Sequence, residues 1–184
     1  MIHPVYAEPS QHYGDNPTSI IKPGSPDYWI IEQFGNYQPA GHTGTDYPVV
    51  SGTRVRAVTG GQVLFAGWMS GTYADNPWWI APSFAGCVLV IDHGAFIGIY
   101  GHLSAVKTKA GDWVAEGQVV ALSGNTGAST GDHLHFEVLP DGYVLSGGMF
   151  GRVDPARYLP AINEPYFTAT PDEQFFIELD LSIP

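Results

Sequence analysis

The chain has a single cysteine and few basic residues, and both scarcities limit what it can be. Cys87 is the one cysteine among 184 residues, so no internal disulfide can form. It lies in an apolar segment, which favours a small core residue over a nucleophile. Lys and Arg number 7 against 18 Asp and Glu, for a formal net charge of −11. Because nucleic-acid binding depends on clustered Lys and Arg, we expect no nucleic-acid partner.

Long hydrophobic runs are also missing. The chain has no run of roughly 18 consecutive apolar residues, so we expect no insertion into a membrane. Its first residues lack the basic and apolar stretches of a secretion signal, so the sequence predicts none. Long stretches of helical periodicity are absent as well. For the oligomeric state we expect a monomer.

Short strand-like segments separated by turns make up most of the chain. Gly and Pro number 23 and 15, and runs rich in Val, Ile, Tyr, Phe and Trp lie between them, which is typical of β-strands. The predicted strands are residues 54–58, 62–68, 87–92, 96–100, 113–114, 119–122, 133–139 and 143–145. The sequence therefore predicts an all-β fold, with an antiparallel β-sheet core of sandwich type and long connecting loops.

Composition divides the chain into three parts. Residues 1–27 are rich in Pro, Ser, Gly and Asn and predict an irregular N-terminal arm. Residues 28–160 hold the predicted strands and form the expected domain. Residues 161–184 form an acidic tail in which apolar residues alternate from Phe175 to Leu181, so the tail contains one more strand or begins a further module.

The segment Gly131–Val138 carries the most informative motif. His133 and His135 lie two residues apart in a strand-like pattern, so their side chains leave the strand on the same side. Glu137 shares that face, while the residues between them form an apolar opposite face. Two imidazoles held side by side on a strand favour a metal site. We expect Glu137 to orient a ligand imidazole or to sit at the groove wall, because a metal-bound histidine usually needs a second hydrogen-bond partner.

A second histidine motif supplies further ligands. His42 is followed four residues later by Asp46, within a segment whose Gly and β-branched residues disfavour a helix. Catalytic zinc takes three protein ligands and keeps a fourth position for water. His42, Asp46 and one histidine of the His-x-His pair would supply that number. The other histidine of the pair and His102 would then be available for acid–base chemistry.

These motifs resemble those of the lysostaphin/LytM-type zinc metallopeptidases, peptidase family M23. The resemblance extends from about residue 31 to residue 159. It is carried by Phe34-Gly35, Gly41-His-Thr-Gly-Thr-Asp46, Gly52-Thr-Arg-Val-Arg-Ala57, Tyr100-Gly-His102-Leu, Gly117-Gln-Val-Val, Ser123-Gly-Asn-Thr-Gly127, His133-Leu-His-Phe-Glu-Val138 and Val153-Asp-Pro155. The loop at residues 70–85 is longer than the connection expected in this family.

The resemblance implies specific roles. It implies His42, Asp46 and His135 as ligands of one Zn²⁺ per chain, and His102 and His133 as the catalytic pair, in a LytM-like fold. All five positions are filled, which favours an active enzyme over the alternative, a catalytically inactive scaffold or binding module in a cell-wall or virion assembly.

The implied activity is zinc-dependent hydrolysis of peptide bridges or stem peptides in bacterial peptidoglycan. Glycine-rich crossbridges and D-alanyl–diamino-acid links are both candidate substrates, and we favour the latter because the acidic charge and the scattered aromatics give no sign of a dedicated wall-binding module. The expected site of action is the bacterial cell wall. Since no signal peptide is predicted, we expect phage-type release, through a holin or from a virion.

Substrate contacts are predicted outside the histidine motifs. Trp78 and Trp79 lie in the aromatic loop, residues 73–84, and we expect one ring to face the groove and the other to pack beneath it. Tyr100, which precedes His102, either lines the groove or packs. Asn125, in the 123–127 turn, is a further predicted substrate contact.

Overall fold

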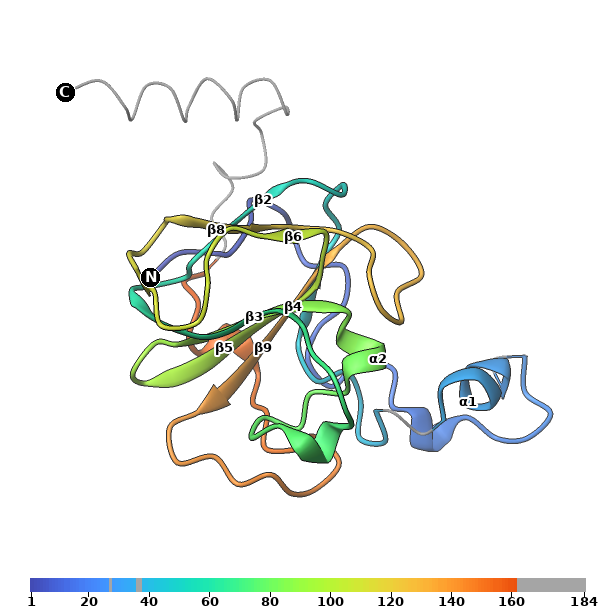
Figure 1. The fold of residues 1–184 in the computed structure, drawn as a ribbon. Coiled ribbons are helices and arrows are strands. Elements are labelled where there is room, and N and C mark those ends of the chain that lie inside the picture. Colours follow the sequence, from blue (N-terminus) through green and yellow to red (C-terminus); the bar gives the residue numbers. More distant parts are fainter. Residues whose placement is uncertain (27, 36–37, 162–184) are drawn as a thin grey trace.

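Two antiparallel sheets carry the fold of this computed structural model, which describes residues 1–26, 28–35 and 38–161 (Figure 1). The larger sheet has six strands in the order β1-β9-β5-β4-β3-β7, and the smaller has three in the order β2-β8-β6. Their bounds are β1 Thr45–Tyr47, β2 Arg54–Arg56, β3 Gly61–Trp68, β4 Cys87–Asp92, β5 Phe96–Leu103, β6 Ala105–Val106, β7 Trp113–Val114, β8 Val119–Leu122 and β9 Leu134–Pro140. The predicted all-β, antiparallel fold is confirmed.

Helices are short in the described part of the chain. They are α1 Tyr28–Phe34, α2 Pro82–Ala85 and the 3-10 helices η1 Thr18–Ile20, η2 Tyr73–Asp75 and η3 Pro155–Arg157. The sequence predicted none of them. No helix among the described residues has the length and apolar character needed to cross a membrane.

The main core lies where the two sheets face each other. Val55 of β2 and Val120 of β8 are fully buried in one cluster with Leu89 of β4 and Phe136 of β9. A second cluster covers the opposite face of the larger sheet, where Ile80 of the aromatic loop packs with residues of β4, β5 and β9. β4 is therefore buried on both faces, which explains its unbroken apolar sequence.

β9 shows the alternation that the sequence predicts. Leu134, Phe136 and Val138 are completely buried in the main core. His135 and Glu137 lie on the opposite face, where both line a pocket. The strand thus presents polar groups on one side while its other side anchors it in the core.

β5 departs from regular alternation where it reaches His102. Cys87 of β4 pairs with Leu103, and Leu89 pairs with Tyr100, so the β5 side has one extra residue. His102 there has a φ of 58°, in the left-handed region. Tyr100 is buried in the core, whereas His102 lines the pocket with Gly101. This β-bulge turns His102 out of the core face that regular alternation would give it.

The described part of the N-terminal arm is irregular but packs against the domain. Its Val5 is 2% exposed and belongs to the main core. Backbone hydrogen bonds from Ser10 N to Asp46 O (2.9 Å) and from Asp46 N to Gln11 O (2.9 Å) place the arm beside β1. The arm therefore extends the larger sheet next to a predicted metal ligand.

The predicted strand at 143–145 is wrong. This segment has no regular structure and follows a turn at residues 141–142; Tyr143 N donates to Pro140 O and Ser146 N to Val144 O. In the C-terminal part of β9 one edge is paired with β5, and the other edge, beyond the end of β1, is bridged at Val138 by Val153 instead of by this segment. The short strands β1 and β6 escaped prediction, and the expected strand in the C-terminal tail lies outside the described residues.

Candidate metal centre and active site

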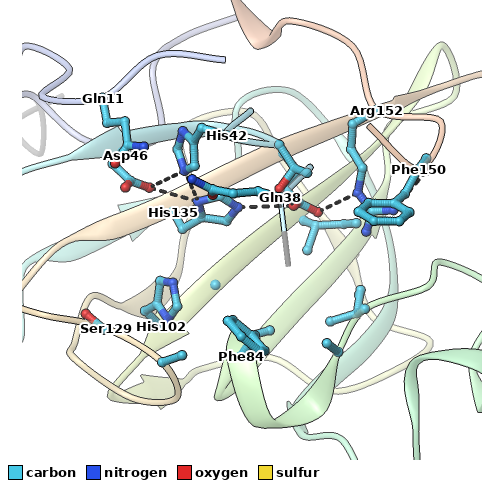
Figure 2. A pocket seen from close by; sticks show the side chains of 18 of the residues that line it. Gln11, Gln38, His42, Asp46, Phe84, His102, Ser129, His135, Phe150 and Arg152 are labelled. Carbon is cyan, nitrogen blue, oxygen red and sulfur yellow. Dashed lines mark hydrogen bonds and ion pairs between the residues drawn. The ribbon is translucent and has the colours of Figure 1, made fainter. Parts of the chain in front are cut away.

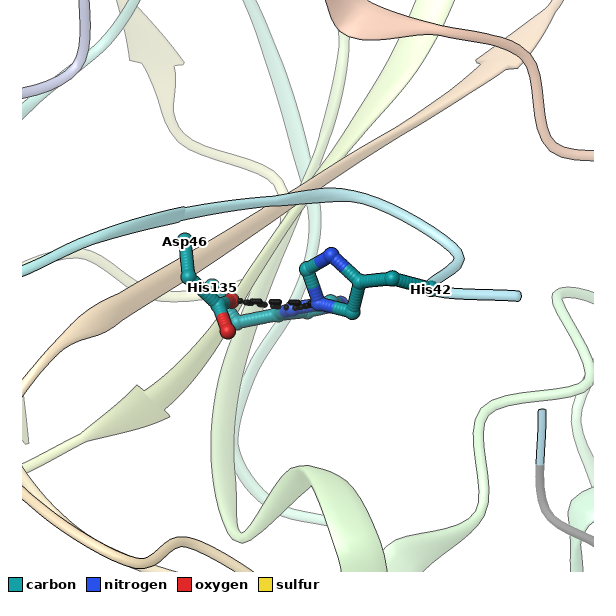
Figure 3. A group of neighbouring side chains, drawn as sticks. All are labelled: His42, Asp46 and His135. Atoms are coloured by element: carbon teal, nitrogen blue, oxygen red, sulfur yellow. Dashed lines mark hydrogen bonds and ion pairs between the residues drawn. The ribbon is translucent and has the colours of Figure 1, made fainter. Parts of the chain in front are cut away.

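Three of the predicted ligands meet on neighbouring strands (Figure 3). Asp46 of β1 and His135 of β9 are cross-strand partners, and His42 lies in the loop before β1. The Nδ1 atom of His135 is 2.8 Å from Asp46 Oδ1 and 3.0 Å from His42 Nε2. His42 Nε2 is 3.3 Å from the same carboxylate oxygen. Among the described residues this is the group whose ligand atoms could hold a metal ion.

The outer ring nitrogens explain why these inner atoms suit a cation. His42 Nδ1 lies 3.2 Å from the carbonyl oxygen of His12, and His135 Nε2 lies 3.1 Å from Glu137 Oε1. Each outer nitrogen donates a proton to its acceptor, so when a metal ion displaces the protons between the inner atoms, each imidazole would turn a lone pair toward the ion. Three acceptors that converge in this way fit a metal ion, and two imidazoles with one carboxylate are a donor set that zinc accepts.

The charges around the ligands also favour a cation. Burial would raise the pKa of Asp46, but hydrogen bonds from His135 and His42 outweigh it and hold that pKa well below its usual range. Burial would lower the pKa of His135, yet hydrogen bonds to Asp46 and Glu137 prevail and raise it to about 10. Two carboxylates on one imidazole therefore make a position that stabilises positive charge.

Glu137 is itself held from two sides. It is 7% exposed, and its oxygens accept hydrogen bonds from Thr43 Oγ1 and from Arg152 Nε, the latter at 3.0 Å. Burial would raise the pKa of Glu137, but the Arg152 charge and the His135 hydrogen bond keep it below its usual range. Glu137 is therefore an ionised acceptor that fixes the orientation of His135, as the sequence analysis expected.

His102 and His133 lie beside the ligands, in the same pocket. The Nδ1 of His102 is 2.7 Å from Thr126 O. Burial, followed by the charges of His135 and His133, lowers the pKa of His102 to about 4. His102 is thus neutral at pH 7, with Nδ1 donating and Nε2 left as an acceptor. His133 Nε2 lies 3.7 Å from Asp46 Oδ1.

A pocket of about 630 Å³ joins the five predicted metal and catalytic residues. Figure 2 shows His42, Asp46 and His135 on one side, His102 across from them, and Phe150 with Arg152 farther along. An apolar wall continues from the metal centre and is built by Tyr73, Trp79, Ile80, Phe84 and Phe150. The arrangement gives an extended chain room to lie along the wall with one bond beside the ligands.

Of the four predicted substrate contacts, one lines the pocket and three lie outside its lining. Trp79 lines the pocket, while Trp78 is half-buried and packs against Phe65, with ring centroids 6.5 Å apart. Tyr100 does not line the groove: it is completely buried, and its hydroxyl accepts a hydrogen bond from Val58 N. Asn125 is exposed and lies outside the pocket lining, so its substrate contact stays a prediction that the structure does not support.

Several pocket residues escaped the sequence analysis. Arg152, Phe150, Gln11 and Gln38 line the pocket from segments far from the histidine motifs. Arg152 is one of only seven cations and directly precedes the Val153-Asp-Pro155 motif, which was the signal available. Thr43 directly follows the ligand His42 and could have been found from its place inside the motif at residues 41–46.

Comparison with known proteins agrees with this geometry. Residues 40–146 match the model of peptidase family M23. The chain is 38% identical over 131 residues to the peptidoglycan DD-endopeptidase ShyA of Vibrio cholerae, an alignment that covers 71% of this chain and 27% of that protein. It is 32% identical over 118 residues to lysostaphin of Staphylococcus staphylolyticus, covering 64% and 22%. The chain thus spans about a quarter of each relative's length.

Solved structures share the fold. The catalytic domain of lysostaphin from Staphylococcus simulans superposes with a TM-score of 0.57 at 26% identity, covering 83% of this chain and 91% of that domain. The catalytic domain of a prophage-encoded M23 protein from Enterococcus faecalis, as a point mutant, has a TM-score of 0.53 at 26% identity, with coverage of 82% and 89%. With its sequence motifs, its fold and its convergent His-Asp-His group, the chain belongs to peptidase family M23.

Proposed function

We propose that this protein is a zinc-dependent endopeptidase that hydrolyses peptide bonds in bacterial peptidoglycan. The observation that carries the proposal is the pocket itself, in which the His42, Asp46 and His135 ligand atoms adjoin two further histidines. An inactive scaffold has no need for all five side chains in one pocket. The similarity to a peptidoglycan endopeptidase and to lysostaphin supports the same activity.

His42, Asp46 and His135 would hold the zinc ion. Bound zinc supplies Lewis acidity, which polarises the scissile carbonyl and lowers the pKa of water at the site. Glu137 accepts the proton on His135 Nε2, so that Nδ1 would be the nitrogen that gives up its proton and turns a lone pair to the zinc ion. The carbonyl of His12 does the same for His42 through Nδ1.

His102 and His133 would move the protons. Because His102 is neutral at pH 7 and binds Thr126 O through Nδ1, its Nε2 can accept a proton from the attacking water. His133 is held through Nδ1, which lies 2.8 Å from Gly131 O, and its Nε2 is directed toward the ligand group. It can therefore donate to the carbonyl oxygen or to the departing amine.

We propose D-alanyl–diamino-acid links as the bond that is cut. The apolar wall beside the ligands offers aromatic surface to the methyl groups of alanyl residues, which a glycine bridge lacks. The relatives include both a DD-endopeptidase and lysostaphin, so the comparison leaves this choice to experiment. For delivery we propose a phage-type route to the cell wall, supported by the likeness to a prophage-encoded protein.

Product analysis tests the proposal. The zinc-loaded protein is incubated with purified muropeptides cross-linked through D-alanyl–diamino-acid links and, separately, with glycine-bridged peptidoglycan, and the products are weighed by mass spectrometry. We expect a mass gain of one water at the D-alanyl link, abolished by a chelator and restored by zinc. A folded, zinc-loaded protein that binds both substrates but cleaves neither would support the scaffold alternative.

A further inference from the structure

Three pocket residues adopt a backbone conformation that side chains rarely take. In the part of the chain that the structure describes, four residues other than glycine have a positive φ, and three of them, Trp79, His102 and Phe150, line the pocket. Their φ angles are 47°, 58° and 52°. Such conformations are unfavourable for residues with a side chain and persist where surrounding contacts hold them. Contacts with neighbouring residues must therefore stabilise the backbone of the pocket wall.

The guanidinium of Arg152 contacts two of these residues through their backbone. Its Nη1 donates to Phe150 O at 2.9 Å, and its Nη2 donates to Trp79 O at 3.4 Å. The aromatic rings of Trp79 and Phe150 lie 6.5 Å apart and together form part of the apolar wall. Arg152 thus holds the two residues whose strained backbone sets the direction of these rings.

The same guanidinium also reaches the metal ligands. Arg152 Nε donates to Glu137 Oε2 at 3.0 Å, and Glu137 Oε1 lies 3.1 Å from His135 Nε2. Arg152 is 5% exposed and Glu137 is 7% exposed, so bulk water screens these bonds little. One buried side chain therefore connects the substrate wall and the ligand His135 (Figure 2).

We propose that Arg152 is a positioning residue that sets the aromatic wall and the His135 imidazole in one common geometry. This rests on the proposed function, in which the wall receives the alanyl part of the peptide while the ligands hold zinc. All three guanidinium nitrogens are used within the protein. Arg152 therefore acts through its neighbours rather than by binding a substrate carboxylate.

The planar fork of arginine matters for this role. Three acceptors, one carboxylate and two carbonyls, lie around its edge, and lysine presents a single compact charge in place of the fork. Arg152→Lys should keep the ion pair with Glu137 but release the Trp79 and Phe150 carbonyls. Arg152→Met should release both the carbonyls and Glu137. The two variants therefore separate the wall from the metal ligand.

The test compares these variants with Arg157→Met, which removes an exposed arginine in η3. Zinc affinity is measured by competition with a chelator, KM and kcat with a D-alanyl cross-linked muropeptide, and backbone exchange by mass spectrometry on peptides covering residues 73–81 and 147–152. For Arg152→Lys we expect a several-fold rise in KM, faster exchange in both peptides, and kcat and zinc affinity close to wild type. For Arg152→Met we expect in addition a loss of zinc affinity of about 10–100-fold.

The double variant Arg152→Met/Glu137→Gln serves as the control for folding, because it removes both buried charges and so leaves no unpaired carboxylate. The inference is overturned if Arg152→Lys shows wild-type KM and exchange, or if Arg152→Met and the double variant hold zinc as tightly as Arg157→Met. If the wild-type protein cleaves no muropeptide, the proposed function fails. Zinc affinity and exchange still decide the role of Arg152 in that case.

Discussion

The imidazole rings of His102 and His133 lie with their centroids 4.6 Å apart, and each is fixed through Nδ1 by a backbone carbonyl. The carbonyls belong to Thr126 and Gly131, in the loop that leads into β9. Because the backbone holds these two rings, their orientation does not depend on the metal ligands. The pair can therefore be altered without taking the ligand group apart.

Single alanine variants of His102 and His133 should fold and retain their metal but lose activity. Each loss should be roughly a hundredfold or more, the scale of general acid–base catalysis. Metal content by elemental analysis and muropeptide cleavage rates provide the two measurements. A variant that loses its metal while His135→Ala retains it would reverse the order assigned to the two histidines of the motif.

Replacing His42, Asp46 or His135 with Ala should abolish both metal retention and lysis. Each supplies one of three ligand atoms, and the remaining two would give an incomplete set. His93→Ala serves as the control, since His93 hydrogen-bonds to Gly60 O and the Tyr100 hydroxyl away from the pocket. Full metal occupancy in His135→Ala would contradict the assignment of His135 as a metal ligand.

Trp79→Ala and Trp78→Ala should fail in different ways. Trp79 faces the pocket, so its loss should raise KM several-fold while the melting temperature stays near wild type. Trp78 packs on Phe65 in the second core cluster, and removing a half-buried ring should cost about 1–3 kcal/mol of the free energy of unfolding. Thermal melts and kinetics on both variants check this. Wild-type behaviour of both would show that the loop is neither wall nor support.

The free energy of unfolding should fall as the pH drops below about 6.5. Burial lowers the pKa of His93 from its model-compound value of 6.5, so at mildly acid pH the unfolded chain binds a proton that the folded chain refuses. Stability should therefore decrease from pH 6.5 downward and level off below the folded pKa.

His93→Gln should flatten this pH dependence. Glutamine keeps a donor for Gly60 O but does not titrate, so the variant loses the His93 contribution. His3, whose pKa burial also lowers, remains and adds a slope of the same sign. Denaturant midpoints between pH 5 and 8 give the comparison. An equal slope in both proteins would remove His93 as the cause.

The strands and the histidine cluster were predictable because both follow from local patterns. Alternation of polar and apolar residues placed His133, His135 and Glu137 on one face of the segment 133–138, and in the structure all three line the pocket, His133 from just before β9. The structure also turns Trp78 and Trp79 in different directions, with Trp79 lining the pocket, but the sequence did not indicate which of the two would do so. Short-range chemistry of this kind needs no knowledge of the partner segments.

Contacts between distant segments could not be predicted. Arg152 contacts Glu137 and Trp79 only because the chain folds back over the pocket. No spacing of residues in the sequence predicts these contacts. The choice between packing and lining the groove for Tyr100 could not be made from the sequence, because alternation says which residues share a face but not which face is buried, and the bulge at His102 breaks the alternation. Residues 143–145 have strand-like composition but no regular structure, because the distant residue Val153 bridges to this part of β9 in their place.

The N-terminal arm also protects the sheet from other molecules. β1 is an edge strand of the larger sheet, and an uncovered edge invites backbone pairing with a second chain. Ser10 and Gln11 occupy the hydrogen-bonding positions of Asp46 on that edge. The arm therefore covers the edge of β1 at Asp46. A strand of a second chain that paired at this edge would otherwise lie against a predicted metal ligand.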